Sequence, residues 1–264
     1  MTLLVRNIAR ARRVLGIGLP SVRPVFLHIP KTAGTSIRKA LTEVYSPHWF
    51  AGADMPEDLP RIWNMPEWRF RRCAYYAGHF GMATVERVRC EKFVFTFLRD
   101  PVERVVSYYY FFRRVQGLTM TPAMLAKKLS LLDYVTCEEP SVRHTVEDQQ
   151  ARVLIESERA IADMVVTAPP GASERAAAAI AQLECFDFVG VTERLAHGLA
   201  VVSKGIGVDL VMHRENITEK RPAVSDISIA ERDAIEERVQ ADRIVYAWAL
   251  GRSEAPCALP KDVP

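Results

Sequence analysis

The sequence predicts an α/β domain with a parallel sheet that is flanked by helices. Two apolar runs, at residues 25–29 and 93–98, have the composition of strands that are buried on both faces of a sheet. Each run leads through a short polar corner into a helical pattern, and strands that alternate with helices form parallel sheets. With 264 residues, of which 49% are hydrophobic and 25% charged, the chain is long enough for one sizeable domain. We therefore expect a basic amphipathic segment at residues 1–24, the domain at residues 25–254 and a loose tail at residues 255–264.

The corner after the first strand has the features of an anion site. Six residues form it: Lys31, Thr32, Ala33, Gly34, Thr35 and Ser36. A helical pattern begins at Ser36 and continues to Val44, and the unpaired N–H groups of a helix N-terminus attract negative charge. Lys31 adds a positive charge, Gly34 allows a close approach of the backbone, and the hydroxyl groups add donors. An ordinary turn with a capping hydroxyl is the alternative interpretation.

The chain between this helix and residue 72 shows no periodicity. It contains four prolines and three tryptophans, Trp49, Trp63 and Trp68. A loop of this length is usually functional or disordered, and its aromatic content argues against disorder. The rings either form a wall of an acceptor site, since flat apolar rings suit sugar faces, or pin the loop to the core.

A histidine follows the next short strand. We expect this strand at residues 73–77 and a short helix at residues 83–89, with His79 between them. A strand end of a parallel sheet is where such folds place their functional sites, so His79 is a candidate. A core or capping histidine is the alternative, and His28, within the first strand, is expected to be structural.

The second corner combines a basic residue with a helix start. Arg99 ends the strand, Asp100 is expected to cap the next helix, and Pro101 suits its first position. The guanidinium of Arg99 can place two N–H donors on a phosphate, and an ion pair with Asp100 or Glu103 is the alternative. Arg104 is expected to pair with Asp100, four residues earlier on the same helix face.

The rest of the chain continues the alternation. We expect helices between residues 121 and 156 with breaks near Pro140, a helix at 173–184, a strand at 186–191, and a helix that Thr192 caps and Gly205 ends. Ser228 and Glu231 form a capping box for a long helix to Leu250, with Gly251 as its stop.

The two corners, in this order and at this separation, resemble those of sulfotransferases that use 3′-phosphoadenosine 5′-phosphosulfate (PAPS). The closest resemblance is to the carbohydrate group that includes heparan sulfate 2-O-sulfotransferases. It implies a P-loop-NTPase-like fold in which residues 30–36 hold the 5′-phosphosulfate, while Arg99 and Ser107 of the R-D-P-x-x-R-x-x-S motif hold the 3′-phosphate. Lys220 and Arg221 lie in a later segment that often covers the nucleotide in this family, with a solvated charge run as the alternative.

The resemblance and the chemistry together indicate two catalytic residues. Sulfuryl transfer is an in-line displacement in which the protein positions groups and stabilises charge. Lys31 is expected to stabilise the leaving phosphate oxygen and the sulfonate. His79 is expected to take the proton of the acceptor hydroxyl, and Tyr-Ala-Gly-His79 matches the family's x-G-H segment. Ala77 stands where some relatives carry another histidine.

The donor implied by the resemblance is PAPS, and the expected acceptor is a hydroxyl-bearing glycan or glycolipid, without a metal. The net charge of +3 does not demand nucleic acid, and we expect none. Five widely spaced cysteines without a C-x-x-C pair suit a reducing compartment, and we expect a cytoplasmic protein. Residues 1–20 carry arginines beside an apolar helical face, a pattern compatible with peripheral contact at the inner membrane surface.

Two other function classes remain open. A P-loop kinase or ATPase shares the outline of the fold and loop, although the motif G-x-x-x-x-G-K-[ST] is absent because Lys31 precedes the glycine. A nucleotide-binding partner protein without catalysis is the other class, and the presence of Lys31, His79 and Arg99 argues against it.

Overall fold

The computed structural model describes residues 20–45, 50–53, 55–211 and 226–254. Most of the expected basic segment 1–24, the tail 255–264, Trp49, Lys220 and Arg221 therefore lie outside the described residues.

The centre of the fold is a five-stranded sheet with the order β2-β3-β1-β4-β5, and every pairing in it is parallel. The strands are β1 (Arg23–Leu27), β2 (Phe50–Ala51), β3 (Tyr75–Gly78), β4 (Lys92–Leu98) and β5 (Phe188–Val191). In the register, Val25 of β1 pairs with Tyr76 on one side and Val94 on the other. All side chains of β1 are buried, as expected for a strand with a layer on each face. The predicted α/β class with a parallel sheet flanked by helices is confirmed.

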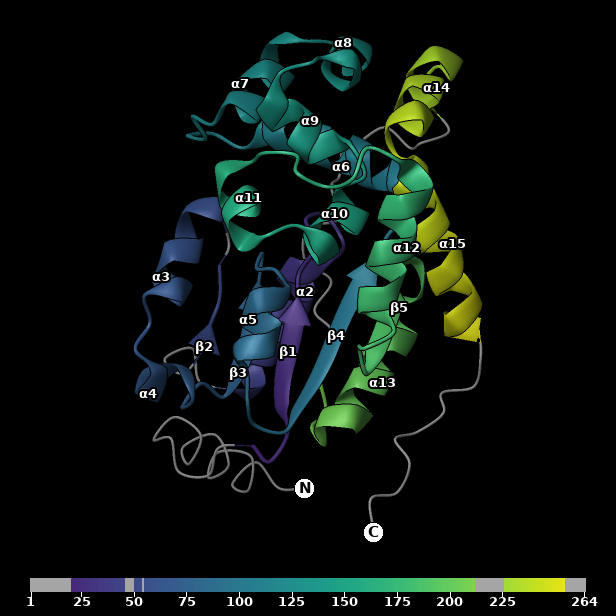
Figure 1. The fold of residues 1–264 in the computed structure, drawn as a ribbon. Coiled ribbons are helices and arrows are strands. Elements are labelled where there is room, and N and C mark those ends of the chain that lie inside the picture. Colours follow the sequence, from purple (N-terminus) through teal and green to yellow (C-terminus); the bar gives the residue numbers. More distant parts are fainter. Residues whose placement is uncertain (1–19, 46–49, 54, 212–225, 255–264) are drawn as a thin grey trace.

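Helices cover both faces of the sheet (Figure 1). Val25 and Leu27 belong to one apolar cluster and Phe26 to another, because successive side chains of a strand point to opposite faces. The first face packs against α5 (Met82–Arg87), α10 (Gln149–Ile155), α11 (Glu158–Asp163), α12 (Ala172–Leu183) and α15 (Gln240–Glu254). The other face packs against α2 (Gly34–Val44) and α13 (Leu195–Ile206).

A second helical layer lies beyond the carboxyl ends of the strands. Figure 1 shows its helices above the arrowheads of β1 and β4. They are α6 (Pro101–Arg114), α7 (Thr121–Lys128), α8 (Leu131–Thr136), α9 (Pro140–Val146) and α14 (Ile229–Arg238), which share a separate apolar core. The carboxyl edge of the sheet, where the candidate residues lie, therefore faces α6 and its neighbours.

The segment expected to be an aperiodic loop contains short elements instead. These are β2, the 3₁₀ turn η2 (Pro56–Asp58), α3 (Leu59–Trp63) and α4 (Glu67–Phe70). Leu59, Ile62 and Phe70 are fully buried in the core, and the indole of Trp63 donates to Glu158 Oε2 at 2.6 Å. For Trp63 the structure therefore supports the alternative in which the ring pins the segment to the core. Trp68 is 63% exposed.

Helix ends agree with the prediction where local signals decide them. Asp100 caps α6 by accepting from the Glu103 N–H at 3.0 Å, and Pro101 is its first residue. Ser228 and Glu231 form the predicted capping box. The predicted helical stretch 121–156 has a break before Pro140 as expected, and also breaks at 129–130 and 147–148 that were not predicted. The other strand and helix boundaries shift by one or two residues, which is common for such ends.

Three predicted helix ends were wrong. The last helix is interrupted at Val239, so that α14 and α15 are separate, and Gly251 lies inside α15. Thr192 begins the 3₁₀ turn η3 (Thr192–Arg194). Helix α13 continues through Gly205 to Ile206, and Gly207, whose φ of 67° is left-handed, is its C-cap. The break at Val239 depends on tertiary contacts: Val239 is fully buried, and the Arg238 carbonyl accepts from the Asp148 N–H at 3.0 Å.

Candidate functional site

The corner between β1 and α2 has a strained backbone. Lys31 and Ala33 have φ values of 71° and 64°, in the left-handed region that is costly for residues with a side chain. Helix α2 begins at Gly34, two residues earlier than predicted, and no side chain of the described residues caps it. The Thr32 hydroxyl donates to the Ile29 carbonyl at 2.8 Å, which ties the corner to the end of β1. Strain of this kind is typical of ligand-binding turns, and here it presents a helix start without a cap.

Gly34 is needed for a different reason than its backbone freedom. A Cβ at this position would lie 1.7 Å from Nε2 of His28, so only glycine fits beside that ring. The positive φ values of this corner belong to Lys31 and Ala33 and not to Gly34. Gly34 thus lets the imidazole of His28 pack directly under the start of α2.

His28 and His79 form a stacked pair. Their ring centroids are 4.2 Å apart, and Nδ1 of His79 lies 2.7 Å from the His28 carbonyl oxygen. A carbonyl only accepts, so Nδ1 of His79 carries the proton and Nε2 carries the lone pair. His79 is therefore held in the tautomer in which Nε2 can accept a proton.

The surroundings keep both imidazoles neutral. Burial lowers the pKa of His79 to about 4; the hydrogen bond to His28 opposes this shift, and the charges of Arg38 and Lys31 add to it. Burial, followed by His79, Arg38 and Lys31, holds the pKa of His28 well below its usual value. At neutral pH the His79 ring is a neutral acceptor beside two cationic side chains.

Arg99 joins the two corners. Its Nη1 donates to the Lys31 carbonyl at 3.3 Å, and its Nη2 forms an ion pair with Glu103 Oε2 at 3.0 Å. The ion pair is the alternative that the sequence left open for Arg99. The structure thus brings Arg99 and Lys31 together, while the phosphate contact of Arg99 stays a prediction.

Helix α6 contributes a second face to the corner. Nζ of Lys31 lies 4.1 Å from the centre of the Phe111 ring, in a cation–π contact. Ser107 precedes Phe111 by four residues, so both lie on one face of α6. This contact was not predicted, because the sequence offers no separate signal for it.

The predicted pair of Arg104 with Asp100 was wrong. Arg104 is fully buried and donates to the carbonyls of Thr145 and Val146 and to Gln149 Oε1. Asp100 instead accepts from Arg243 of α15 at 2.7 Å. Acceptors that come from distant parts of the chain outcompete the nearby carboxylate, because a buried guanidinium needs several partners.

Comparison with known proteins shows which family the chain is similar to. Residues 21–134, which include Lys31, His79, Arg99 and Ser107, match the model of the sulfotransferase family. Heparan sulfate 2-O-sulfotransferase hst-2 of Caenorhabditis elegans is 26% identical over 102 residues, or 34% of this chain and 32% of that protein. Heparan sulfate 2-O-sulfotransferase 1 of Xenopus laevis is 24% identical over 102 residues, or 34% of this chain and 29% of that protein. The resemblance that the two corners predicted is confirmed over the matched residues.

A solved structure gives a weaker likeness. Mouse sulfotransferase SULT7A1 complexed with PAP is matched over 97% of this chain and 79% of that chain, with 12% identity and a TM-score of 0.35. The fold assignment therefore depends on the parallel order of the strands themselves. The chain spans about a third of the length of the curated relatives that it matches.

Two further properties concern the described residues alone. Among them, no helix is long and apolar enough to cross a membrane. Within the same ranges, no group of three or more His, Cys, Asp or Glu side chains is arranged to hold a metal ion.

Proposed function

We propose that this protein is a sulfotransferase that moves the sulfuryl group of PAPS to a hydroxyl of a carbohydrate or glycolipid. One observation carries the proposal: the candidate residues follow three neighbouring strands. His79 follows β3, Lys31 follows β1 and Arg99 follows β4, and these strands are adjacent in the sheet. Ligands of parallel α/β sheets bind at this edge, so one donor can meet all three residues.

The first corner is suited to the phosphosulfate end of the donor. The N-terminus of α2 offers N–H groups and a positive dipole end, and Lys31 adds a full charge beside them. Thr35 is exposed at the first turn, whereas Ser36 is buried there. We expect residues 31–36 to bind the 5′-phosphosulfate and to stabilise the negative charge of the leaving phosphate oxygen.

Arg99 and Ser107 are the proposed contacts of the 3′-phosphate. A planar guanidinium binds phosphate through two parallel hydrogen bonds, and Arg99 lies at the carboxyl end of its strand. The Glu103 carboxylate pairs with one side of this guanidinium, so we expect phosphate binding to replace that internal ion pair.

His79 is the proposed base. Its Nε2 takes the proton of the acceptor hydroxyl while the acceptor oxygen bonds to sulfur and the bond from sulfur to the phosphate oxygen breaks. A pKa of about 4 makes the free imidazole a weak base. Negative charge of the bound donor offsets the cationic neighbours and raises this pKa, because a nearby anion favours the protonated form.

The test has a binding step and a transfer step. Calorimetry should show that the protein binds adenosine 3′,5′-bisphosphate more tightly than ATP, with and without Mg²⁺. Labelled sulfate should then pass from PAPS to at least one member of a panel of glycans and glycolipids. His79→Ala should keep the affinity for the bisphosphate and lose on the order of 10²-fold or more in transfer rate, since it removes the base and no nucleotide contact.

Specific outcomes would contradict the proposal. If the wild type fails to bind the bisphosphate, PAPS is not its donor. ATP turnover that requires Mg²⁺ would instead support a P-loop kinase or ATPase. Nucleotide binding without transfer to any acceptor would favour a non-catalytic partner protein. Equal transfer rates for wild type and His79→Ala would remove His79 as the base.

A further inference from the structure

We propose that Gln150 is a positioning residue that fixes Arg99 for recognition of the 3′-phosphate. The inference rests on the proposed function, since it concerns the residue assigned to that phosphate. It adds an internal support, on a helix outside both sequence motifs, to the donor site.

The side-chain amide of Gln150 forms two hydrogen bonds with the backbone of Arg99, one through its oxygen and one through its nitrogen. Its Oε1 accepts from the Arg99 N–H at 2.9 Å, and its Nε2 donates to the Arg99 carbonyl at 3.0 Å. The last residue of β4 that pairs with a neighbouring strand is Leu98, opposite Val191. At Arg99 a side chain therefore takes over the hydrogen bonds that a neighbouring strand would otherwise supply.

This clamp determines where the guanidinium lies. Two hydrogen bonds fix the peptide groups on both sides of the Arg99 Cα, and so fix the direction in which its side chain leaves the backbone. From there Nη1 reaches the Lys31 carbonyl and Nη2 reaches Glu103. A long side chain places its charge precisely only when the backbone from which it extends is fixed. Precise placement of binding groups depends on such supporting contacts.

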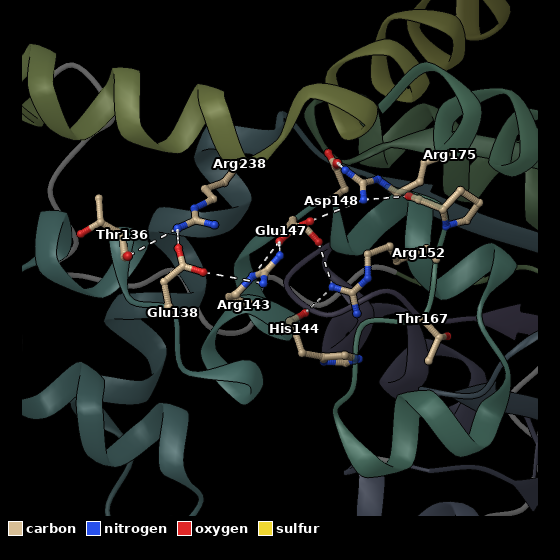
Figure 2. Close-up of polar contacts among 12 residues, drawn as sticks. Thr136, Glu138, Arg143, His144, Glu147, Asp148, Arg152, Thr167, Arg175 and Arg238 are labelled. Carbon is tan, nitrogen blue, oxygen red and sulfur yellow. Dashed lines mark hydrogen bonds and ion pairs between the residues drawn. The ribbon is translucent and has the colours of Figure 1, made fainter. Parts of the chain in front are cut away.

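Gln150 is itself rigidly held from α15. Asp242 accepts from the backbone N–H groups of Gln150 and Ala151 at 3.2 and 2.8 Å, at the start of α10. The Asp242 N–H donates to Asp148 Oδ1 at 2.9 Å, and Asp148 forms an ion pair with Arg175 at 3.0 Å. Figure 2 shows Arg175 directed at Asp148. Gln150 and Asp242 are fully buried, so the support is shielded from water.

A buried side chain of this kind could serve stability alone. Gln150→Met keeps the length of the side chain and removes both hydrogen bonds to Arg99. Gln149→Met makes the same change at the neighbouring buried residue, whose Oε1 accepts from Arg104 Nη1 at 2.7 Å and not from Arg99. The two variants thus share helix, burial and chemistry and differ in the contact with Arg99.

The readout is the ratio of the affinities for adenosine 3′,5′-bisphosphate and adenosine 5′-monophosphate, which isolates the 3′-phosphate. We expect Gln150→Met to lower this ratio by on the order of tenfold. Gln149→Met should lower the unfolding midpoint and leave the ratio unchanged. An unchanged ratio in Gln150→Met, or an equal loss in both variants, overturns the inference while the proposed function stands. A wild type that binds neither nucleotide overturns the proposed function and the inference with it.

A second measurement needs no variant and applies if Gln150→Met does not fold. Hydrogen exchange of the nucleotide-free wild type should show a protected Arg99 amide, because its N–H is bonded to a buried side chain. Exchange at the rate of an unprotected amide would overturn the clamp.

Discussion

At Arg99, a guanidinium expected to meet phosphate is held by a carboxylate one helical turn ahead. Arg99 and Glu103 are 21% and 29% exposed, so their ion pair is partly screened and contributes about 0–1 kcal/mol. An incoming phosphate must displace this carboxylate and also meets its charge. The Glu103 carboxylate therefore competes with the proposed phosphate for the Arg99 guanidinium.

Glu103→Gln should tighten the binding of adenosine 3′,5′-bisphosphate about two- to fivefold, because it removes this competition. Arg99→Ala should weaken binding by ~2–4 kcal/mol, the scale of a lost charge partner. Calorimetry at constant salt measures both. Asp163→Asn breaks another i,i+4 pair, with Arg159 at 2.7 Å, and serves as the control without effect. Weaker binding in Glu103→Gln would mean that the carboxylate positions Arg99 instead of competing for it.

Residue by residue, the sequence predicted the candidates better than their partners. Lys31, His79 and Arg99 could be placed at strand ends because the end of an apolar run is a local signal. The partners of Arg99 and Arg104 could not all be predicted, since Gln150 and Thr145 lie 51 and 41 residues away from them along the chain. The stacking of His28 on His79 was equally hidden, because it depends on the pairing of β1 with β3.

Elements show the same division between local and tertiary causes. The strands and the capped starts of α6 and α14 follow from apolar runs and from side chains within four residues. The end at Val239 depends on the core in which this side chain is buried, whereas the end at Gly207 depends on the left-handed backbone of that glycine. Helices commonly end at a glycine whose backbone is left-handed, as at Gly207, whereas Gly251 lacks this conformation and lies inside α15.

Two alanine substitutions separate these cases. Gly251→Ala should raise the free energy of unfolding by about 0.5–1 kcal/mol, because Gly251 lies inside a helix with nothing within 4 Å of the added Cβ. Gly207→Ala should lower it by about 1 kcal/mol, since alanine is strained at a φ of 67°. Urea denaturation measures both values. A destabilising Gly251→Ala would place the end of α15 where the sequence first suggested.

Across the whole molecule, buried ionisable groups set how stability depends on pH. Burial, with Arg152 and Arg104, lowers the pKa of His144 to about 3, and neither ring nitrogen of His144 has a hydrogen-bond partner among the described residues. Figure 2 shows His144 beside Arg152. Glu156 Oε2 lies 4.0 Å from Nε2 of this ring. The pKa values of His28 and His79 are lowered as well, so below pH 6.5 the unfolded chain binds up to three protons that the folded chain does not.

Two carboxyl groups act in the opposite direction. Burial raises the pKa of Asp242 to about 6, against the charge of Arg104, and burial also raises the pKa of Asp148. Each binds a proton in the folded state before the unfolded state does, so acidification through this range favours folding at these groups. Acidification destabilises the folded state at the three histidines and stabilises it at the two carboxyl groups. Because the histidines are more numerous, we expect the free energy of unfolding to fall on acidification.

The free energy of unfolding should therefore fall by roughly 1–3 kcal/mol per pH unit near pH 5. His144→Phe, which keeps the ring volume and removes one titrating group, should reduce this slope by about 1.4 kcal/mol per pH unit. Urea denaturation at a series of pH values gives the slopes, and wild type and variant should differ less in stability above pH 7.5. A stability that rises on acidification from pH 6.5 to 5 would contradict the lowered pKa values of these histidines.

The ring of His28 under Gly34 also has an evolutionary consequence. A side chain at position 34 would clash with the imidazole at position 28. We therefore expect Gly34 to be replaced only when His28 is replaced as well. Homologues that gain a Cβ at position 34 should have already replaced the histidine with something smaller, and would then lack the surface on which His79 stacks. Paired substitution at these two positions should mark lineages in which the chemistry of this edge has changed.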